Sequence, residues 1–88
     1  MKISVRYFAS VRERLGAGQD LSWPDGAEGV PATVGDLRQW LIGQSEDHAD
    51  ALAMTKGLRS ACNQTMCAPG EPLTDGAEVA FFPPVTGG

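Results

Sequence analysis

The sequence predicts a single α+β domain in which one main helix packs across one face of a mixed sheet of four or five strands. A length of 88 residues suits one domain. The start of the chain alternates as a strand does, and a segment with helical spacing separates it from a second half with several strand patterns. Strands that flank one helix in this way are typical of the α+β class.

The overall composition limits the kinds of partner. With 42% apolar and 20% charged residues, the chain has the composition of a folded globular protein. Its net charge of −4 disfavours nucleic acid, because phosphate binding needs a patch of Lys and Arg. The first residues do not form the apolar core of a signal peptide, and no run of about 18 apolar residues could cross a bilayer. We therefore expect a cytoplasmic protein without a membrane partner.

The first strand is expected in "KISVRYFA", where Ile3, Val5 and Tyr7 would share the buried face. The next segment, "SVRERLGAG", places Val11 and Leu15 four residues apart and stops at a glycine, which favours a single helical turn. A second strand is expected around "QDLSW", where the turn signal "PDG" closes it.

The main helix is predicted in "ATVGDLRQWLIGQ". Thr33 can cap its N-terminus, and the negative charge of Asp36 lies where it favours the positive end of a helix. An apolar stripe at helical spacing should cover the sheet. Its members are Val34, Leu37, Trp40 and Leu41.

The polar segment "SEDHADALAMTKG" is expected to be a connector with one short helix. It contains His48, which no serine or cysteine motif accompanies, so we expect a solvated surface side chain and not a catalytic one. After this connector the pattern returns to strands. Turns are predicted at Asn63-Gln64 and at Asp75-Gly76, and the last strand at "EVAFF".

No catalytic or metal site is indicated inside the domain. Cys62 and Cys67 offer only two thiols, and the single histidine is distant, which disfavours zinc. A disulfide is disfavoured because no secretory signal is present. The glycines form neither of the common phosphate-binding motifs. We therefore expect two reduced, structural cysteines and no metal.

The unusual chemistry lies in the end of the sequence, "FFPPVTGG". Pro83 and Pro84 have no N–H group, so they cannot continue a strand ladder, and they favour an extended chain. The boundary between domain and tail is thus expected after residue 82, with the domain in 1–82 and an extended tail in 83–88. Six residues can extend roughly 20 Å from the domain.

The last two residues of the tail, Gly87 and Gly88, lack side chains, so they can pass through a narrow channel into a foreign active site. A carboxylate is a poor electrophile, but coupling it to AMP from ATP gives an acyl-adenylate that a sulfur or amine nucleophile can attack. The tail is therefore interpreted as a carrier of an activated group.

Three sequence features together resemble a known family. They are "NQT" after the third strand, "PLTDGAEVAFFPPV", and the terminal "GG". The whole chain is similar to the small, ubiquitin-like sulfur carrier subunits of molybdopterin synthases, which serve molybdenum cofactor biosynthesis. This resemblance implies a β-grasp fold.

The resemblance also implies a reaction cycle. A dedicated activating enzyme would use ATP to adenylate Gly88, and a sulfur donor would convert it to a thiocarboxylate, a transient 1-thioglycine. The tail would then enter the active site of the large synthase subunit and give its sulfur to a cyclic pterin precursor. The catalytic side chains would lie in that large subunit, within a heterotetramer of two small and two large chains, and no cofactor would be bound permanently.

The same resemblance assigns roles to residues. Gly88 would carry the group and Gly87 would permit threading. Partners would dock near the end of the last strand, with the exposed apolar surface of Phe81, Phe82 and Val85 at the centre. Neighbours in a strand face opposite sides, so one of the two rings must point away from the helix. The expected partner-binding residues are Phe81, Phe82, Pro83, Pro84, Val85 and Thr86.

Three alternatives remain at this point. A sulfur carrier for another pathway, such as thiamine thiazole synthesis, would share the fold and the Gly-Gly end, although "FFPP" and the length favour the molybdopterin family. A protein modifier would end in an isopeptide bond from Gly88 to lysine. A plain interaction domain would survive the loss of Gly88 without loss of function.

Overall fold

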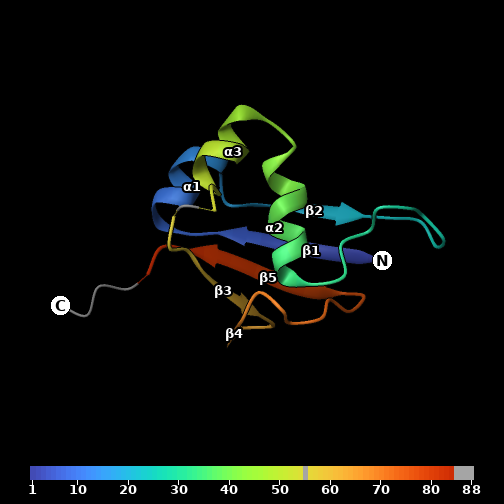
Figure 1. Ribbon diagram of the computed structural model, residues 1–88. Coiled ribbons are helices and arrows are strands. Elements are labelled where there is room, and N and C mark those ends of the chain that lie inside the picture. Colours follow the sequence, from blue (N-terminus) through green and yellow to red (C-terminus); the bar gives the residue numbers. More distant parts are fainter. Residues whose placement is uncertain (55, 85–88) are drawn as a thin grey trace.

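The computed structural model describes residues 1–54 and 56–84 (Figure 1). In these ranges the chain forms one five-stranded sheet in the order β2-β1-β5-β3-β4. β1 and β5 run parallel, and the other neighbouring pairs are antiparallel, so the sheet is mixed as predicted. The strands are β1 Lys2–Tyr7, β2 Gly18–Ser22, β3 Arg59–Cys62, β4 Thr65–Cys67 and β5 Ala77–Phe82.

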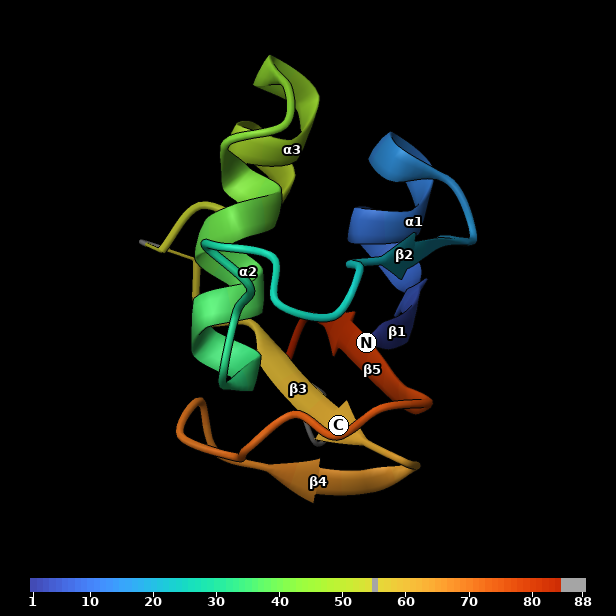
Figure 2. The same ribbon diagram turned by 90° about the vertical axis from the view of Figure 1, so that its right-hand side faces the viewer.

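Within residues 1–54 and 56–84, three helices lie on one face of this sheet (Figures 1 and 2). α2 is the main helix that the sequence predicts, and Thr33 caps it by accepting a hydrogen bond from the Asp36 N–H at 3.1 Å. α1 is longer than the single turn that we expected, and α3 is the short helix of the connector. Among the described residues, no helix has both the length and the apolar character needed to cross a membrane. The helices are α1 Ala9–Leu15, α2 Val34–Ile42 and α3 Glu46–Ala51.

This arrangement confirms the β-grasp fold, because a mixed sheet curves around one main helix. The predicted inner face of β1 is buried, and the predicted stripe of α2 packs against it. Trp40 departs from the stripe: it is half-buried and packs edge-on against Trp23, with the ring centroids 5.1 Å apart. The largest core side chains from these elements are Ile3, Val5, Tyr7, Leu37, Leu41, Val79 and Phe81.

The two turns predicted in the second half of the chain are also present. Asn63 and Gln64 join β3 to β4 with φ angles of 51° and 67°, the combination that a two-residue hairpin turn requires. The turn at Asp75-Gly76 is fixed to β1, because the Lys2 N–H donates to the Asp75 carboxylate at 2.7 Å. The start of β5 is thus aligned with the start of β1.

His48 differs from the prediction of a solvated surface side chain. It is half-buried, with Nδ1 2.7 Å from the Ser45 hydroxyl and Nε2 3.0 Å from the Gln19 side-chain oxygen. The same oxygen accepts a hydrogen bond from the Tyr7 hydroxyl at 2.9 Å. His48 therefore connects α3 to β2 and to the core. Local sequence could not indicate this, because Gln19 and His48 are 29 residues apart.

Candidate functional site

The candidate site begins where β5 ends. β5 is the central strand of the sheet, between β1 and β3, and its last residue is Phe82. Phe82 lies opposite Arg59 of β3, and the Phe8 N–H donates to the Phe81 carbonyl at 3.2 Å. Neighbours on both sides thus hold the last residues of β5. A tail that follows this strand starts from a rigid support.

The two adjacent phenylalanines point to opposite faces of the sheet. Phe81 is 1% exposed and belongs to the core beneath α2, whereas Phe82 is half-buried on the other face. The sequence predicted that one ring would face outward, and the structure identifies it as Phe82. Phe81 therefore supports the site from inside the core, and its ring is not available for contact with a partner.

Phe8 is an additional aromatic residue that sequence reasoning did not select. It directly follows β1 and is 47% exposed, next to the end of β5. The alternation of β1 contained the signal, because Tyr7 is buried and its neighbour must then face outward. Phe8 and Phe82 together give the region of the tail exit an apolar surface.

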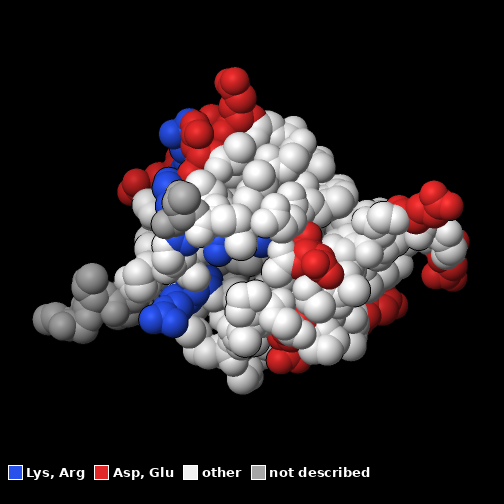
Figure 3. Space-filling model, in the orientation of Figure 1, with Lys and Arg blue, Asp and Glu red and all other residues white. Residues whose placement is uncertain are grey.

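The outer face of the sheet beside this exit carries small and basic side chains. Ala80 lies opposite Ala61 of β3 on one side and opposite Arg6 of β1 on the other. Arg6 forms an exposed ion pair with Glu78 at 3.8 Å. Figure 3 shows basic side chains close to the described end of the chain, while acidic side chains gather over α3. The exit region is thus less acidic than the net charge suggests.

The described side chains offer little chemistry of their own. In residues 1–54 and 56–84, no cluster of three or more His, Cys, Asp or Glu residues could hold a metal ion. Cys62 and Cys67 are free thiols. Burial is the main cause that raises the pKa of Cys62, and the nearby Cys67 and Glu71 raise it further. A raised pKa keeps the thiol protonated at neutral pH and makes it a weak nucleophile.

The predicted tail residues are described only in part. Pro83 is half-buried and Pro84 is exposed, directly after β5. The other tail residues to which the sequence assigned roles lie outside the described residues. They are Val85, Thr86, Gly87 and Gly88.

Comparison with known proteins finds a matching family and similar proteins over nearly the whole chain. The model of the ThiS family matches residues 5–88. The molybdopterin synthase sulfur carrier subunit of Escherichia coli (strain K12) is 49% identical over 86 residues, which cover 98% of this chain and 99% of that protein. The subunit of the same name from Haemophilus influenzae is 37% identical over 87 residues, again 98% and 99% of the two chains.

A solved structure gives a further similarity. The small archaeal modifier protein 1 of Haloferax volcanii superposes with a TM-score of 0.69 and 28% identity, over 96% of this chain and 98% of that one. The fold therefore occurs both in sulfur carriers and in a protein named as a modifier.

Proposed function

Since this chain belongs to the ThiS family, we propose that it is the sulfur carrier subunit of a molybdopterin synthase. The observation that carries the proposal is the 49% identity to a protein of that name over 98% of this chain. The anchored end of β5 supports it. A carrier needs a reactive tail on a stable support, and its partners supply the catalytic groups.

The proposed cycle uses the terminal carboxylate of Gly88. In the first step this carboxylate attacks the α-phosphorus of ATP in an activating enzyme, and pyrophosphate leaves. In the second step a sulfide-level sulfur from a donor attacks the carbonyl carbon, the bond from that carbon to the AMP oxygen breaks, AMP leaves, and a thiocarboxylate remains. In the large synthase subunit, the sulfur passes to the pterin precursor, and water restores the carboxylate. Because the first step consumes ATP, the cycle belongs in the cytoplasm.

The chain's own residues contribute support, reach and recognition. β5 fixes the point from which the tail starts, and the two prolines favour an extended direction. The tail in 83–88 can reach roughly 20 Å, far enough to place Gly88 inside a partner. Phe82 and Phe8 would dock against the large subunit, and two such pairs would assemble as a heterotetramer.

The test is deletion of Gly88. We expect the truncated chain to unfold at the same temperature as the full chain and still to bind the large subunit. It should form no thiocarboxylate and support no pterin conversion, because the reacting carbon is withdrawn by about 3.3 Å and catalysis tolerates a misplacement of only about 1 Å. Intact mass spectrometry of protein taken from cells measures the exchange of one oxygen for one sulfur. Full pterin conversion by the truncated chain would overturn the carrier mechanism.

A second candidate function is protein modification, which the similarity to the archaeal modifier protein favours. It requires the same activation of Gly88, so the deletion does not separate the two functions. The two functions are separated by a search for conjugates of this chain with lysines of other proteins, which only the modifier forms. We expect the mass of the protein from cells to show the thiocarboxylate on the free chain, whereas a ladder of conjugates on an immunoblot would support the modifier.

A further inference from the structure

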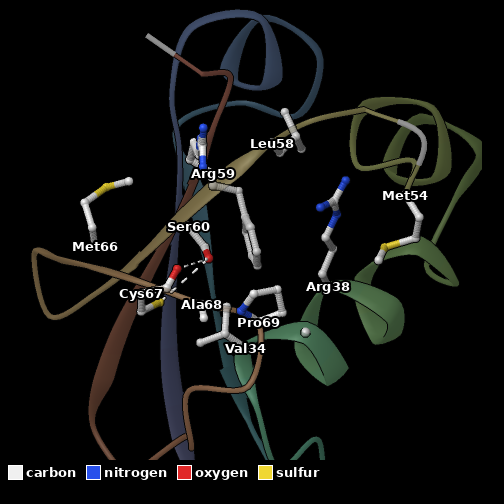
Figure 4. A pocket seen from close by; sticks show the side chains of 12 residues that line it. Val34, Arg38, Met54, Leu58, Arg59, Ser60, Met66, Cys67, Ala68 and Pro69 are labelled. Carbon is white, nitrogen blue, oxygen red and sulfur yellow. Dashed lines mark hydrogen bonds between the residues drawn. The ribbon is translucent and has the colours of Figure 1, made fainter.

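A groove of about 490 Å³ lies between α2 and the β3–β4 hairpin (Figure 4). Ser60 pairs with Phe81 and with Cys67 across the strands, so all three face the helix side of the sheet. Phe82 faces the opposite side. The floor of the groove therefore lies on the face opposite Phe82. Among its lining residues are Val34, Arg38, Leu58, Ser60, Cys67 and Pro69.

One end of the groove is closed by the loop after β4. The Gly35 N–H donates to the Pro69 carbonyl at 2.8 Å, and the Val34 N–H donates to the Glu71 carbonyl at 3.0 Å. The helix and the loop approach so closely that a Cβ on Gly35 would lie 3.1 Å from the Pro69 side chain. These contacts make the closed end a preformed wall.

The floor of the groove presents a mainly apolar surface to a ligand. The Ser60 hydroxyl donates to the Cys67 carbonyl at 3.3 Å and lies 3.7 Å from the Cys67 sulfur, so the polar atoms of the floor satisfy each other. At the open end, Met54 is 54% exposed beside the half-buried Leu58. Methionine adapts its shape readily to a bound side chain.

The open end is also positively charged. Arg38 points into the groove in Figure 4, and its guanidinium donates to the carbonyls of Leu52, Ala53 and Lys56 at 2.8, 2.6 and 3.0 Å. Those carbonyls hold the side chain in place but do not neutralise its charge. Arg59, at the start of β3, is exposed at the edge of the groove, where the strand register also places it opposite Phe82.

The other charged pairs of the chain leave this rim free. Within the described ranges, the ion pairs join Arg6 to Glu78 and Arg14 to Asp47 and Asp50. No described carboxylate pairs with the cations at the open end of the groove. The chain has a net charge of −4, so unpaired cations beside the apolar groove make this region attract acidic ligands, unlike the chain as a whole.

We propose that this groove binds an extended segment of a partner protein in which apolar side chains are flanked by acidic ones. A volume of about 490 Å³ accommodates a few side chains, and the apolar floor removes them from water. The cations at the rim match acidic neighbours and disfavour basic ones. The proposal goes beyond the carrier function, because the floor of the groove lies on the face opposite Phe82 and its occupant is a partner segment and not a transferred group.

The test uses three capped peptides and the full-length chain labelled with ¹⁵N. One peptide alternates aspartate with leucine, the second lysine with leucine, and the third aspartate with serine. We expect only the first to shift amide resonances, and the shifts to concentrate at Gly35, Ser60, Cys67 and Ala68. Shifts confined to the outer face of the sheet, equal binding of the lysine peptide, or no shifts up to the solubility limit would each overturn the proposal.

Variants separate the groove from the docking surface. Met54→Asp places negative charge at the open end and should weaken binding of the aspartate-leucine peptide by about tenfold or more. Arg12→Glu makes a larger charge change on α1, outside the groove, and should have less than about a twofold effect. Phe8→Ala should leave peptide binding unchanged. If Arg12→Glu weakens binding as much as Met54→Asp, only net charge is sensed, and the groove is not the site.

Discussion

Tyr7 is a core residue whose hydroxyl group forms a hydrogen bond to a neighbouring strand. It is 1% exposed, and its hydroxyl still finds a partner because Gln19 reaches inward from β2. Burial raises the pKa of Tyr7 to about 12. The neutral phenol is favoured because ionising it would place a charge among apolar side chains.

Alkaline pH should therefore destabilise the fold through Tyr7. The folded-state pKa lies above the unfolded value of about 10, so the stabilising effect is complete below pH 10 and is lost as the pH rises towards 12. We expect the free energy of unfolding to fall by about 2 to 3 kcal/mol across this window. The phenolate absorbance measures the titration directly, since Tyr7 is the only tyrosine in the sequence. Tyr7→Phe should lose this step, and an unchanged profile in that variant would assign the pH dependence to other groups.

The two cysteines should be dispensable for sulfur transfer. The proposed sulfur travels on Gly88, and the raised pKa of Cys62 makes its thiol a weak nucleophile. The double variant Cys62→Ala, Cys67→Ala should still become a thiocarboxylate, as measured by intact mass after incubation with the activating enzyme and a sulfur donor. A variant that unfolds normally but never accepts sulfur would contradict the proposed route.

At the scale of elements, β2 depends on a glycine at its first position. A Cβ on Gly18 would collide with the Val5 carbonyl oxygen and lie 3.2 Å from the Cα of Arg6. We expect Gly18→Ala to lower the free energy of unfolding by about 2 kcal/mol or more, measured by urea denaturation. Gly70→Ala is the matched control, because its added Cβ would meet no atom within 4 Å. Equal stability of the two variants would mean that β1 and β2 can separate without cost.

The elements that the sequence predicted best are those whose signals are local. The alternation around Val5 and the Thr33 cap each involve residues within one element, so composition and spacing were sufficient. The role of His48 depends on Gln19 in a different element, and no local pattern contains that pairing. The groove likewise requires the loop at Pro69 to meet the first turn of α2, which only tertiary packing decides.

In the candidate site, too, local sequence predicted some features, whereas others depend on tertiary packing. The order of the final residues indicated a reactive tail, and strand alternation required one outward ring. It could not determine which of Phe81 and Phe82 is buried, because that depends on which face of β5 meets α2. Phe8 was missed because its importance comes from lying next to β5, at the other end of the sequence.

At the scale of the whole molecule, association should depend on the aromatic side chains around the tail exit. Phe82→Ala should weaken binding to the large synthase subunit about 30-fold or more, because aromatic anchors commonly contribute about 2 kcal/mol or more at interfaces. We expect Phe8→Ala to weaken it in the same direction. Isothermal titration calorimetry measures both affinities.

A matched control comes from the opposite side of the sheet. Met54 is 54% exposed, a fraction similar to that of Phe8, but it lies at the groove. Met54→Ala should leave the affinity for the large subunit unchanged. Affinities that are unaffected by either phenylalanine substitution would show that the tail alone supplies the binding energy.

The parallel pairing of β1 with β5 joins the beginning of the chain to its last strand at the centre of the sheet. During synthesis, β1 leaves the ribosome first and lacks this central neighbour until β5 has been translated. Contacts between such distant segments form late and make folding slower than local contacts do. A polypeptide released before β5 therefore cannot complete the sheet or present Phe82. The topology thus ties completion of the sheet to synthesis of the last strand, because β5 is the neighbour of both β1 and β3.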